Sequence, residues 1–237
     1  MLVSIIICSH NSAATLDGAL YSALSQDFPP DEYEVLLVDD GSTDETVELV
    51  ASYEKKHGNF RYVRLPLSKG KSAACEQGLR TARGRYFTCL GPDDALHPRM
   101  LTECVAPLER GLADLAYCDY HEVAFTDGSH RYVRLDGFDP VEMIGGGAML
   151  RAEIFRALAG PLGSGGKARG GYQEYAQASK CRPHHVPHPL YYRSLQSPEG
   201  ANAGSRIIHG PSVPGVGSEG LVVIKEQSPS VDRKLTA

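Results

Sequence analysis

The feature that most constrains this chain is an alternation, over its first 90 residues, of short apolar runs with segments of helical spacing. The apolar runs cover 2–8, 33–38, 60–65 and 86–90, and the helical segments cover 15–26, 44–57 and 72–82. Strands that alternate with helices of this length form a doubly wound, mainly parallel sheet with helices on both faces. Ligands bind such sheets beyond the carboxyl ends of the strands. The sequence therefore predicts an α/β fold and directs attention to the polar residues that follow each strand.

The order of elements becomes less regular after residue 91. The predicted elements are a helix from about Pro98, a strand over 115–120, a hairpin of 122–125 with 131–135, and helices over 152–159 and 172–179. A glycine-rich loop over 160–171 precedes the last helix. We interpret 1–97 and 98–196 as two halves of one domain, the second with a small subregion of its own. Because 197–237 begins with a stretch rich in Gly and Pro, we expect it to be a flexible tail.

Composition excludes several classes of function. With 24 basic and 29 acidic residues the net charge is -5, so no overall positive field holds a nucleic-acid backbone, and nucleic acid is not an expected partner. No run approaches the roughly 18 to 20 apolar residues that cross a bilayer. The six cysteines lack CxxC spacing, which is typical of buried free thiols in a reducing compartment. We expect a cytoplasmic protein whose contact with a membrane, if any, is peripheral and at the inner face.

A first pair of carboxylates follows the predicted strand over 33–38. Asp39 and Asp40 begin a polar segment that continues through Gly41 to Asp44. Carboxylates at such a strand end accept hydrogen bonds from a base or a ribose. We interpret Ser42, Thr43 and Asp44 as turn formers and helix caps. Asp39 is assigned to ligand binding, because a carboxylate at the strand end is not needed to cap a helix several residues later.

A second pair of carboxylates follows the predicted strand over 86–90. Asp93 and Asp94 lie in the segment from Gly91 to Pro98. Adjacent carboxylates on a sharp turn offer the hard oxygen ligands that Mg²⁺ and Mn²⁺ prefer, with phosphate oxygens and water completing the shell. Since turns are rich in Asp for purely conformational reasons, the position of the pair at the same sheet edge as Asp39 is what favours a metal site.

Five segments in this order resemble the family 2 glycosyltransferases, which are inverting enzymes of the GT-A fold. The segments are Ser9-His10-Asn11, Val38 to Asp44, Ser68 to Ala74, Gly84-Arg85-Tyr86 and Pro92-Asp93-Asp94. The resemblance covers roughly residues 2 to 195 and is strongest over the first 100. It implies transfer of a sugar from a nucleotide diphosphate sugar, commonly UDP-linked, to the hydroxyl of a carbohydrate or glycoconjugate acceptor, as in polysaccharide synthesis.

The resemblance also implies roles for individual residues. Asp39 would read the nucleotide base, with Ser9, Asn11 and Asp40 also binding the donor. Lys69 and Lys71 would lie near the donor. Asp93 with Asp94 would hold Mn²⁺ or Mg²⁺ against the diphosphate. Glu174 corresponds to the segment that supplies the catalytic base, and Glu153 and Asp139 are the alternatives.

Two departures from the family pattern leave other functions open. Gly91 stands where the family's metal motif often begins with Asp, and Cys75-Glu76 stands where many members have Arg-Asn. A catalytically impaired protein of the same fold that binds nucleotide sugars, or acts as a scaffold, is therefore one alternative. A nucleotidyltransferase is another, although its glycine-rich signature loop after the first strand is not present in Ser9 to Ser12. The sugar, the acceptor and the oligomeric state are not predicted.

Overall fold

The computed structural model describes residues 1–124, 128–135, 146–154 and 181–195. Within these residues the sheet has nine strands, and four parallel strands in the order β3-β2-β1-β4 form its first half. These strands are β1 (Val3–Ser9), β2 (Tyr33–Asp39), β3 (Phe60–Arg64) and β4 (Tyr86–Leu90). β1 and β2 are buried along their whole length, as expected for parallel strands covered on both faces.

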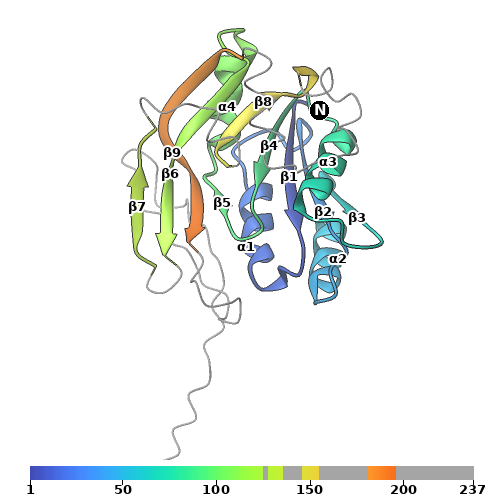
Figure 1. Ribbon diagram of the computed structural model, residues 1–237. Coiled ribbons are helices and arrows are strands. Elements are labelled where there is room, and N and C mark those ends of the chain that lie inside the picture. Colours follow the sequence, from blue (N-terminus) through green and yellow to red (C-terminus); the bar gives the residue numbers. More distant parts are fainter. Residues whose placement is uncertain (125–127, 136–145, 155–180, 196–237) are drawn as a thin grey trace, which may run out of the picture.

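Three helices cover the two faces of the parallel strands (Figure 1). They are α1 (Ala13–Leu24), α2 (Thr46–Lys56) and α3 (Lys71–Thr81). The Tyr33 hydroxyl donates to the carbonyl of Leu24, which fixes α1 against one face. On the other face α3 approaches β1 closely at Gly78, where a Cβ atom would lie 2.6 Å from Cγ2 of Ile6. Both the sheet and the coverage by helices on each face agree with the sequence-based prediction.

The second half of the sheet is mixed. Its elements are β5 (Ala95–Leu96), α4 (Met100–Glu109), β6 (Leu115–Ala124), β7 (His130–Val133), β8 (Ala148–Arg151) and β9 (Pro183–Leu195). β8 lies antiparallel between β4 and β6, β9 runs parallel to β6, and β7 pairs antiparallel with β6. The α/β fold class is confirmed. The parallel arrangement, however, holds for β3 to β4 and for the β6-β9 pair, because β8 enters the sheet in the opposite direction.

The predicted hairpin is present, and β9 pairs with both β6 and β5. Residues 120–123 of β6 pair with 130–133 of β7, so the register differs by a few residues from the predicted pairing of 122–125 with 131–135. Along β9 the register against β6 shifts after Val186, and pairing resumes at Pro189. Proline has no amide proton to donate to a neighbouring strand, so a bulge is a position at which it is tolerated. The two-residue strand β5, which pairs with Tyr191 and Tyr192, was not predicted because two residues carry no periodicity.

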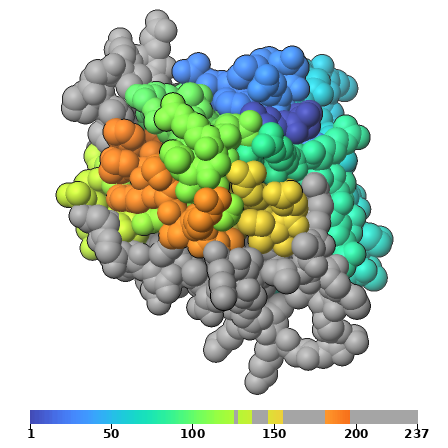
Figure 2. Space-filling view, turned by 90° about the horizontal axis from the view of Figure 1, so that it is seen from above, coloured from blue at the N-terminus to red at the C-terminus, as the bar shows by residue number. Residues whose placement is uncertain are grey.

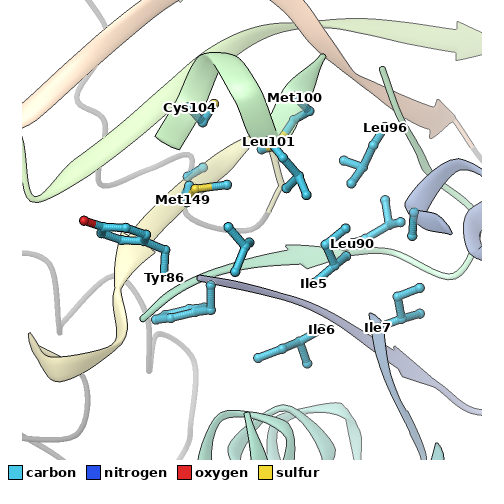
Figure 3. Packing of buried hydrophobic residues seen from close by; sticks show 14 of the residues in the cluster. Ile5, Ile6, Ile7, Tyr86, Leu90, Leu96, Met100, Leu101, Cys104 and Met149 are labelled. Carbon is cyan, nitrogen blue, oxygen red and sulfur yellow. The ribbon is translucent and has the colours of Figure 1, made fainter. Parts of the chain in front are cut away.

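One hydrophobic core joins the two halves. Met100 and Leu101 of α4, and Met149 of β8, have no exposed surface. Figure 3 shows these side chains of α4 facing Met149 and the strands β1 and β4. In the space-filling view of Figure 2, β8 lies between β9 and the segment around α3. Strands from 1–97 and from 98–196 therefore belong to one sheet over one core.

Two expectations from composition meet the structure here. All six cysteines are free thiols, and Cys8, Cys104 and Cys118 are buried. Among the described residues, no helix is both long and apolar enough to span a bilayer. The expected cytoplasmic location stays a prediction.

Candidate active site

The loops that follow β1, β2 and β3 are hydrogen-bonded to one another at the carboxyl edge of the sheet. Ser9 at the end of β1 lies opposite Asp39 at the end of β2. The amide of Asp40 donates to the carbonyl of Ser9, and the amide of Leu65 donates to the carbonyl of Asp39, both at 2.8 Å. The Ser9 hydroxyl is buried and has no hydrogen-bond partner within the described part of the chain. The predicted donor residues of the first two loops therefore do lie side by side.

Asn11 fastens the loop after β1 to the loop after β2. Its amide donates to Oγ of Ser42 at 2.9 Å, and its Oδ1 accepts from the amide of Thr43 at 2.8 Å. Asn11 has a φ of 50°, a left-handed conformation that asparagine tolerates better than most residues. The neighbouring His10 donates through Nδ1 to the carbonyl of Asp40, since a carbonyl oxygen can only accept. The hydrogen bonds of Asn11 therefore hold the loop after β1 against the loop after β2.

The carboxylate of Asp39 is completely buried at the end of β2. Its Oδ1 accepts from the amide of Ser42 and its Oδ2 from the hydroxyl of Tyr62, each at 2.8 Å. Nε of Arg64 lies 3.4 Å from Oδ2. Burial and the neighbouring carboxylate raise the pKa of Tyr62, which keeps its hydroxyl a donor. Asp39 therefore stabilises the turn that follows it, a role that the sequence analysis gave only to Ser42, Thr43 and Asp44.

Asp40 holds the loop after β3 in place. Its Oδ1 accepts from the amide of Lys69, and its Oδ2 accepts from the Ser68 hydroxyl and the amide of Gly70, at 2.7 to 2.8 Å. Burial on its own would raise the pKa of Asp40, but these three hydrogen bonds overcome it and hold the pKa below the ordinary value. The two loops also touch at Gly41, where a Cβ would lie 2.8 Å from the amide nitrogen of Ser68.

Lys69 and Lys71 are exposed on either side of Gly70, which precedes α3. Because the Asp40 carboxylate holds the backbone of this loop, it fixes the main-chain positions from which the side chains of Lys69 and Lys71 extend. Glu76, one of the departures from the family pattern, forms an ion pair with Arg80 at 2.7 Å one turn along α3. Its negative charge is therefore met within the helix by an arginine.

Asp94 connects the loop after β4 to β9. Its Oδ2 accepts from the hydroxyl of Tyr191 at 2.5 Å, and its Oδ1 accepts from the amide of Ser194 at 2.8 Å. Burial raises the pKa of Asp94 above its ordinary value, with the Asp93 charge acting in the same direction. Tyr191 is itself buried and lies against Gly146, where a Cβ would come within 2.6 Å of the ring.

The departure at Gly91 has a direct structural consequence. A Cβ atom at this position would lie 2.3 Å from Oδ2 of Asp94 and 3.1 Å from Oδ1 of Asp93. The first distance is shorter than real Cβ contacts show, and the second is tighter than most of them. The absent side chain therefore provides the space that the Asp94 carboxylate occupies when it reaches Tyr191.

The residues that could hold a divalent ion are the carboxylates of Asp93 and Asp94. Hard carboxylate oxygens fit Mg²⁺ or Mn²⁺, and such ions usually take one or two of them together with phosphate oxygens. Within the described residues, no group of three or more His, Cys, Asp or Glu side chains could form a closed protein cage. Both oxygens of Asp94 already accept hydrogen bonds, which fixes the orientation of its carboxylate.

Comparison with known proteins identifies the family. A model described as glycosyl transferase family 2 matches residues 4–158, more than half of the chain. The chain belongs to glycosyl transferase family 2. The resemblance stated from the sequence is thereby confirmed, and this family 2 chain is similar to curated glycosyltransferases of bacteria.

Two such relatives share part of their length with this family 2 chain. The poly-beta-1,6-N-acetyl-D-glucosamine synthase of Staphylococcus epidermidis is 32% identical over 94 residues, which cover 40% of this chain and 22% of that protein. The cholesterol galactosyltransferase of Borreliella burgdorferi is 36% identical over 99 residues, covering 42% of this chain and 27% of that protein. The matched region is therefore a minor part of each relative.

Solved structures confirm the fold. S. aureus TarS 1-349 in complex with UDP-GlcNAc superimposes with a TM-score of 0.70 at 21% identity, covering 84% of this chain and 60% of that one. The mannosyltransferase PcManGT from Pyrobaculum calidifontis, in complex with GDP-Man and Mn²⁺, gives a TM-score of 0.64 at 18% identity, covering 83% and 57%. At these identities the likeness shows the fold alone, and the predicted GT-A architecture is confirmed.

The sequence missed two side chains of this family 2 site. Tyr62 and Arg64 of β3 both contact the Asp39 carboxylate. Arg64 ends its strand as Asp39 does, so the rule that selected Asp39 would also have found it. The predicted base Glu174, its alternative Asp139, the loop over 160–171 and the tail over 197–237 lie outside the described residues. Glu153 is described and exposed, next to β8.

Proposed function

We propose that this chain transfers a sugar from a nucleotide diphosphate sugar, UDP-linked in the simplest case, to an acceptor hydroxyl with inversion at the anomeric carbon. The observation that carries the proposal is the set of loops after β1, β2 and β3, which the side chains of Asn11, Asp39 and Asp40 hold together in a chain of this family. Preorganised loops at the carboxyl edge suit a nucleotide. The UDP-GlcNAc complex of TarS supports the choice of donor class.

In this proposal the described residues divide the binding of the donor between them. Asp39 is assigned to the base, with the buried hydroxyl of Ser9 beside it. Asp40 acts indirectly, because its hydrogen bonds position the backbone that carries Lys69. Lys69 and Lys71 attract the diphosphate. Residues 1–97 would thus form the donor half and 98–196 the acceptor half.

Asp93 and Asp94 would hold a divalent ion at the diphosphate. A bound Mn²⁺ or Mg²⁺ supplies stabilisation of the negative charge that develops on the departing diphosphate. The Mn²⁺ complex of PcManGT supports this assignment. The Asp94 contacts with Tyr191 and Ser194 fix the conformation of the loop on which Asp93 lies.

The transfer is a single displacement. An acceptor oxygen attacks the anomeric carbon, the bond to the diphosphate oxygen breaks, and the acceptor proton passes to a carboxylate. We assign that base to Glu174. Glu174→Gln keeps the shape but cannot accept a proton, so turnover is expected to fall roughly 100-fold or more with donor affinity little changed. Single-turnover transfer and UDP titration measure the two quantities. Near-normal transfer would move the base to Glu153 or Asp139.

Titration calorimetry with UDP, with and without Mn²⁺, tests the donor site directly. Asp39→Ala is expected to weaken UDP binding by about 1.5 to 3 kcal/mol, the range for a lost hydrogen bond to a charged group. UDP and UDP-GlcNAc should lose equal affinity if Asp39 reads the base. A loss of affinity for UDP-GlcNAc but not for UDP contradicts that role.

A donor-hydrolysis assay then separates an enzyme from a scaffold. Hydrolysis of UDP-sugars supports transfer. Tight UDP binding with neither hydrolysis nor transfer to any tested acceptor favours the scaffold alternative. An absence of UDP binding contradicts the proposed function as a whole. The family match already favours sugar transfer over nucleotidyl transfer.

A further inference from the structure

Three of the six free thiols lie on one face of the sheet, where α3 packs on β1. A Cβ atom at Gly78 of α3 would lie 2.6 Å from Cγ2 of Ile6, so Ile6 points toward α3. Because side chains alternate along a strand, Cys8 points to the same face. Cys89 is the β4 partner of Ile6 and shares that face. Cys75 lies three residues before Gly78, on the side of α3 that faces β1.

Cys8 and Cys75 are in direct contact, and we call them the thiol pair. The Cys8 thiol donates a hydrogen bond to the Cys75 sulfur, which raises the pKa of Cys8, and burial adds to that rise. Cys8 is 8% exposed, whereas Cys75 is half-buried and keeps some surface in contact with solvent. The half-buried Cys89 also raises the pKa of Cys8 through its charge, so it lies nearby. One member of the pair is therefore reachable from solution, and the other is held against it.

A second pair of contacting thiols differs from the first in access. Cys104 of α4 and Cys118 of β6 are also hydrogen-bonded to each other, which raises the pKa of Cys104 together with burial. Their exposed fractions are 0% and 1%. An oxidant dissolved in water reacts most readily with thiols that have exposed surface. Of the two pairs, the thiol pair is therefore the one that is open to chemistry from solution.

The thiol pair connects two elements of the proposed donor site. Cys8 precedes Ser9, whose carbonyl accepts from the amide of Asp40. Cys75 lies one helical turn after Lys71, and the Lys71 charge acts on the pKa of Cys8 in the direction opposite to burial. Sulfur atoms in contact are roughly 3.5 Å apart, whereas those of a disulfide are about 2.05 Å apart. A bond between the two sulfurs would therefore draw the start of α3 toward the end of β1.

We propose that Cys8 and Cys75 form an oxidation site, at which hydrogen peroxide converts the two thiols into a disulfide that weakens donor binding. The thiolate of Cys75 attacks the peroxide, the O–O bond breaks, and Cys75 becomes a sulfenic acid while the departing hydroxide takes up the proton that Cys75 released. The Cys8 sulfur then attacks the Cys75 sulfur, the S–O bond breaks, and the Cys8 proton leaves with the oxygen as water. Two thiols are oxidised and one peroxide is reduced to two waters. The effect on binding rests on the proposed function.

Peptide mapping by mass spectrometry tests the pair itself. The reduced full chain is treated with hydrogen peroxide, denatured, alkylated with iodoacetamide and digested with trypsin. Trypsin separates the three cysteines of this face, which fall in peptides 1–55, 72–80 and 86–99. We expect the first two peptides to be joined, with a mass lower by two hydrogen atoms than their sum, and dithiothreitol to separate them. Cys104 and Cys118 should be recovered as alkylated thiols, because they lack exposed surface.

Titration calorimetry with UDP measures the consequence for the donor site. Oxidation is expected to weaken UDP binding roughly tenfold, as the displacement of one charged contact does, and reduction should restore it. Cys75→Ser removes the attacking thiol, so peroxide should leave the UDP affinity of this variant unchanged. Cys181→Ser is the matched control, because Cys181 is also half-buried but lies next to β9. It should retain both the joined peptides and the loss of affinity.

Four results would overturn the inference. They are no joined peptides in a chain that binds UDP, joined peptides with unchanged UDP affinity, equally fast oxidation of Cys104 with Cys118, and a peroxide effect on UDP binding that persists in Cys75→Ser. Each leaves the donor site standing. The mapping does not depend on UDP, so a reduced chain that binds no UDP would instead count against the proposed function.

Discussion

The two aspartate pairs at the carboxyl edge have the same sequence pattern but are held in different ways. Asp39 and Asp40 accept hydrogen bonds from residues within 30 positions of them in the chain. Asp94 is held by Tyr191 and Ser194, 97 and 100 residues further along. The pKa shifts also differ in sign, since hydrogen bonds lower the pKa of Asp40 while burial raises that of Asp94.

This difference shows how the site is assembled. The parallel half, once folded, can arrange the loops around Asp39 and Asp40 from its own residues. The loop of Asp93 and Asp94 reaches its conformation only when β9 has paired with β5 and β6. The first pair therefore depends on local loops and the second on completion of the sheet, and three experiments can break or sharpen the distinction.

The largest effect is expected at Asp40. Asp40→Ala removes the acceptor for two backbone amides and the Ser68 hydroxyl, so we expect a loss of roughly 3 kcal/mol in unfolding free energy together with weaker UDP binding. Urea denaturation followed by circular dichroism measures it, since the chain has no tryptophan. Glu45→Ala, at an exposed carboxylate nearby, is the control and should change little. A loss as small as that of the control would show that the three hydrogen bonds contribute little to the free energy of unfolding.

A smaller effect is expected at Gly91, in the second pair. Gly91→Ala places a methyl group against the Asp94 carboxylate and should destabilise the fold by about 2 kcal/mol, as overpacking does. In an Asp94→Ala background the same change should have a much smaller effect, which a double-mutant cycle detects. Gly58→Ala is the matched control, because a Cβ there meets nothing within 4 Å. Equal effects of Gly91→Ala in both backgrounds would refute the close contact.

The smallest effect is a pH dependence that belongs to the first pair. The pKa of Asp40 is lower in the folded state than its ordinary 3.8, so the ionised group stabilises the fold at higher pH and loses that contribution as the pH falls. The difference in unfolding free energy between the unsubstituted chain and Asp40→Asn should be constant above about pH 5 and shrink below pH 4. Urea titrations between pH 3 and 7 measure it. A difference that grows toward acid would reverse the assigned sign.

Much of the fold follows from local pattern. The seven segments predicted before residue 91 all correspond to β1 to β4 and α1 to α3, with shifts of a few residues at their ends. Periodicity reports burial along one segment, and these segments are long enough to show it. β5 is too short for that signal, and the direction of β8 depends on its neighbours. Neither was within reach of a sequence pattern.

For the candidate site, the sequence predicted the position of residues at the sheet edge but not their hydrogen-bond partners. A polar residue after a parallel strand lies at the carboxyl edge, which is why Asp39 and Asp93 could be chosen from the order of the strands and helices, whereas Ser9 was implied by the family resemblance. The sequence could not say that Asp39 faces Tyr62, or that Asp40 serves the loop around Lys69. Such pairings depend on which strands are neighbours and in what register they pair.

The sequence by itself therefore determined the α/β class, the edge of the sheet at which chemistry is expected, and the family. The tertiary structure decided which carboxylate oxygens accept hydrogen bonds and that the Asp94 carboxylate occupies the space beside Gly91. It also decided that β9 brings Tyr191 to Asp94 and Tyr192 to His121. The physical reason is range. Periodicity and turn residues act over a few positions, whereas the partner of a buried side chain is chosen by packing between segments that lie far apart in the chain.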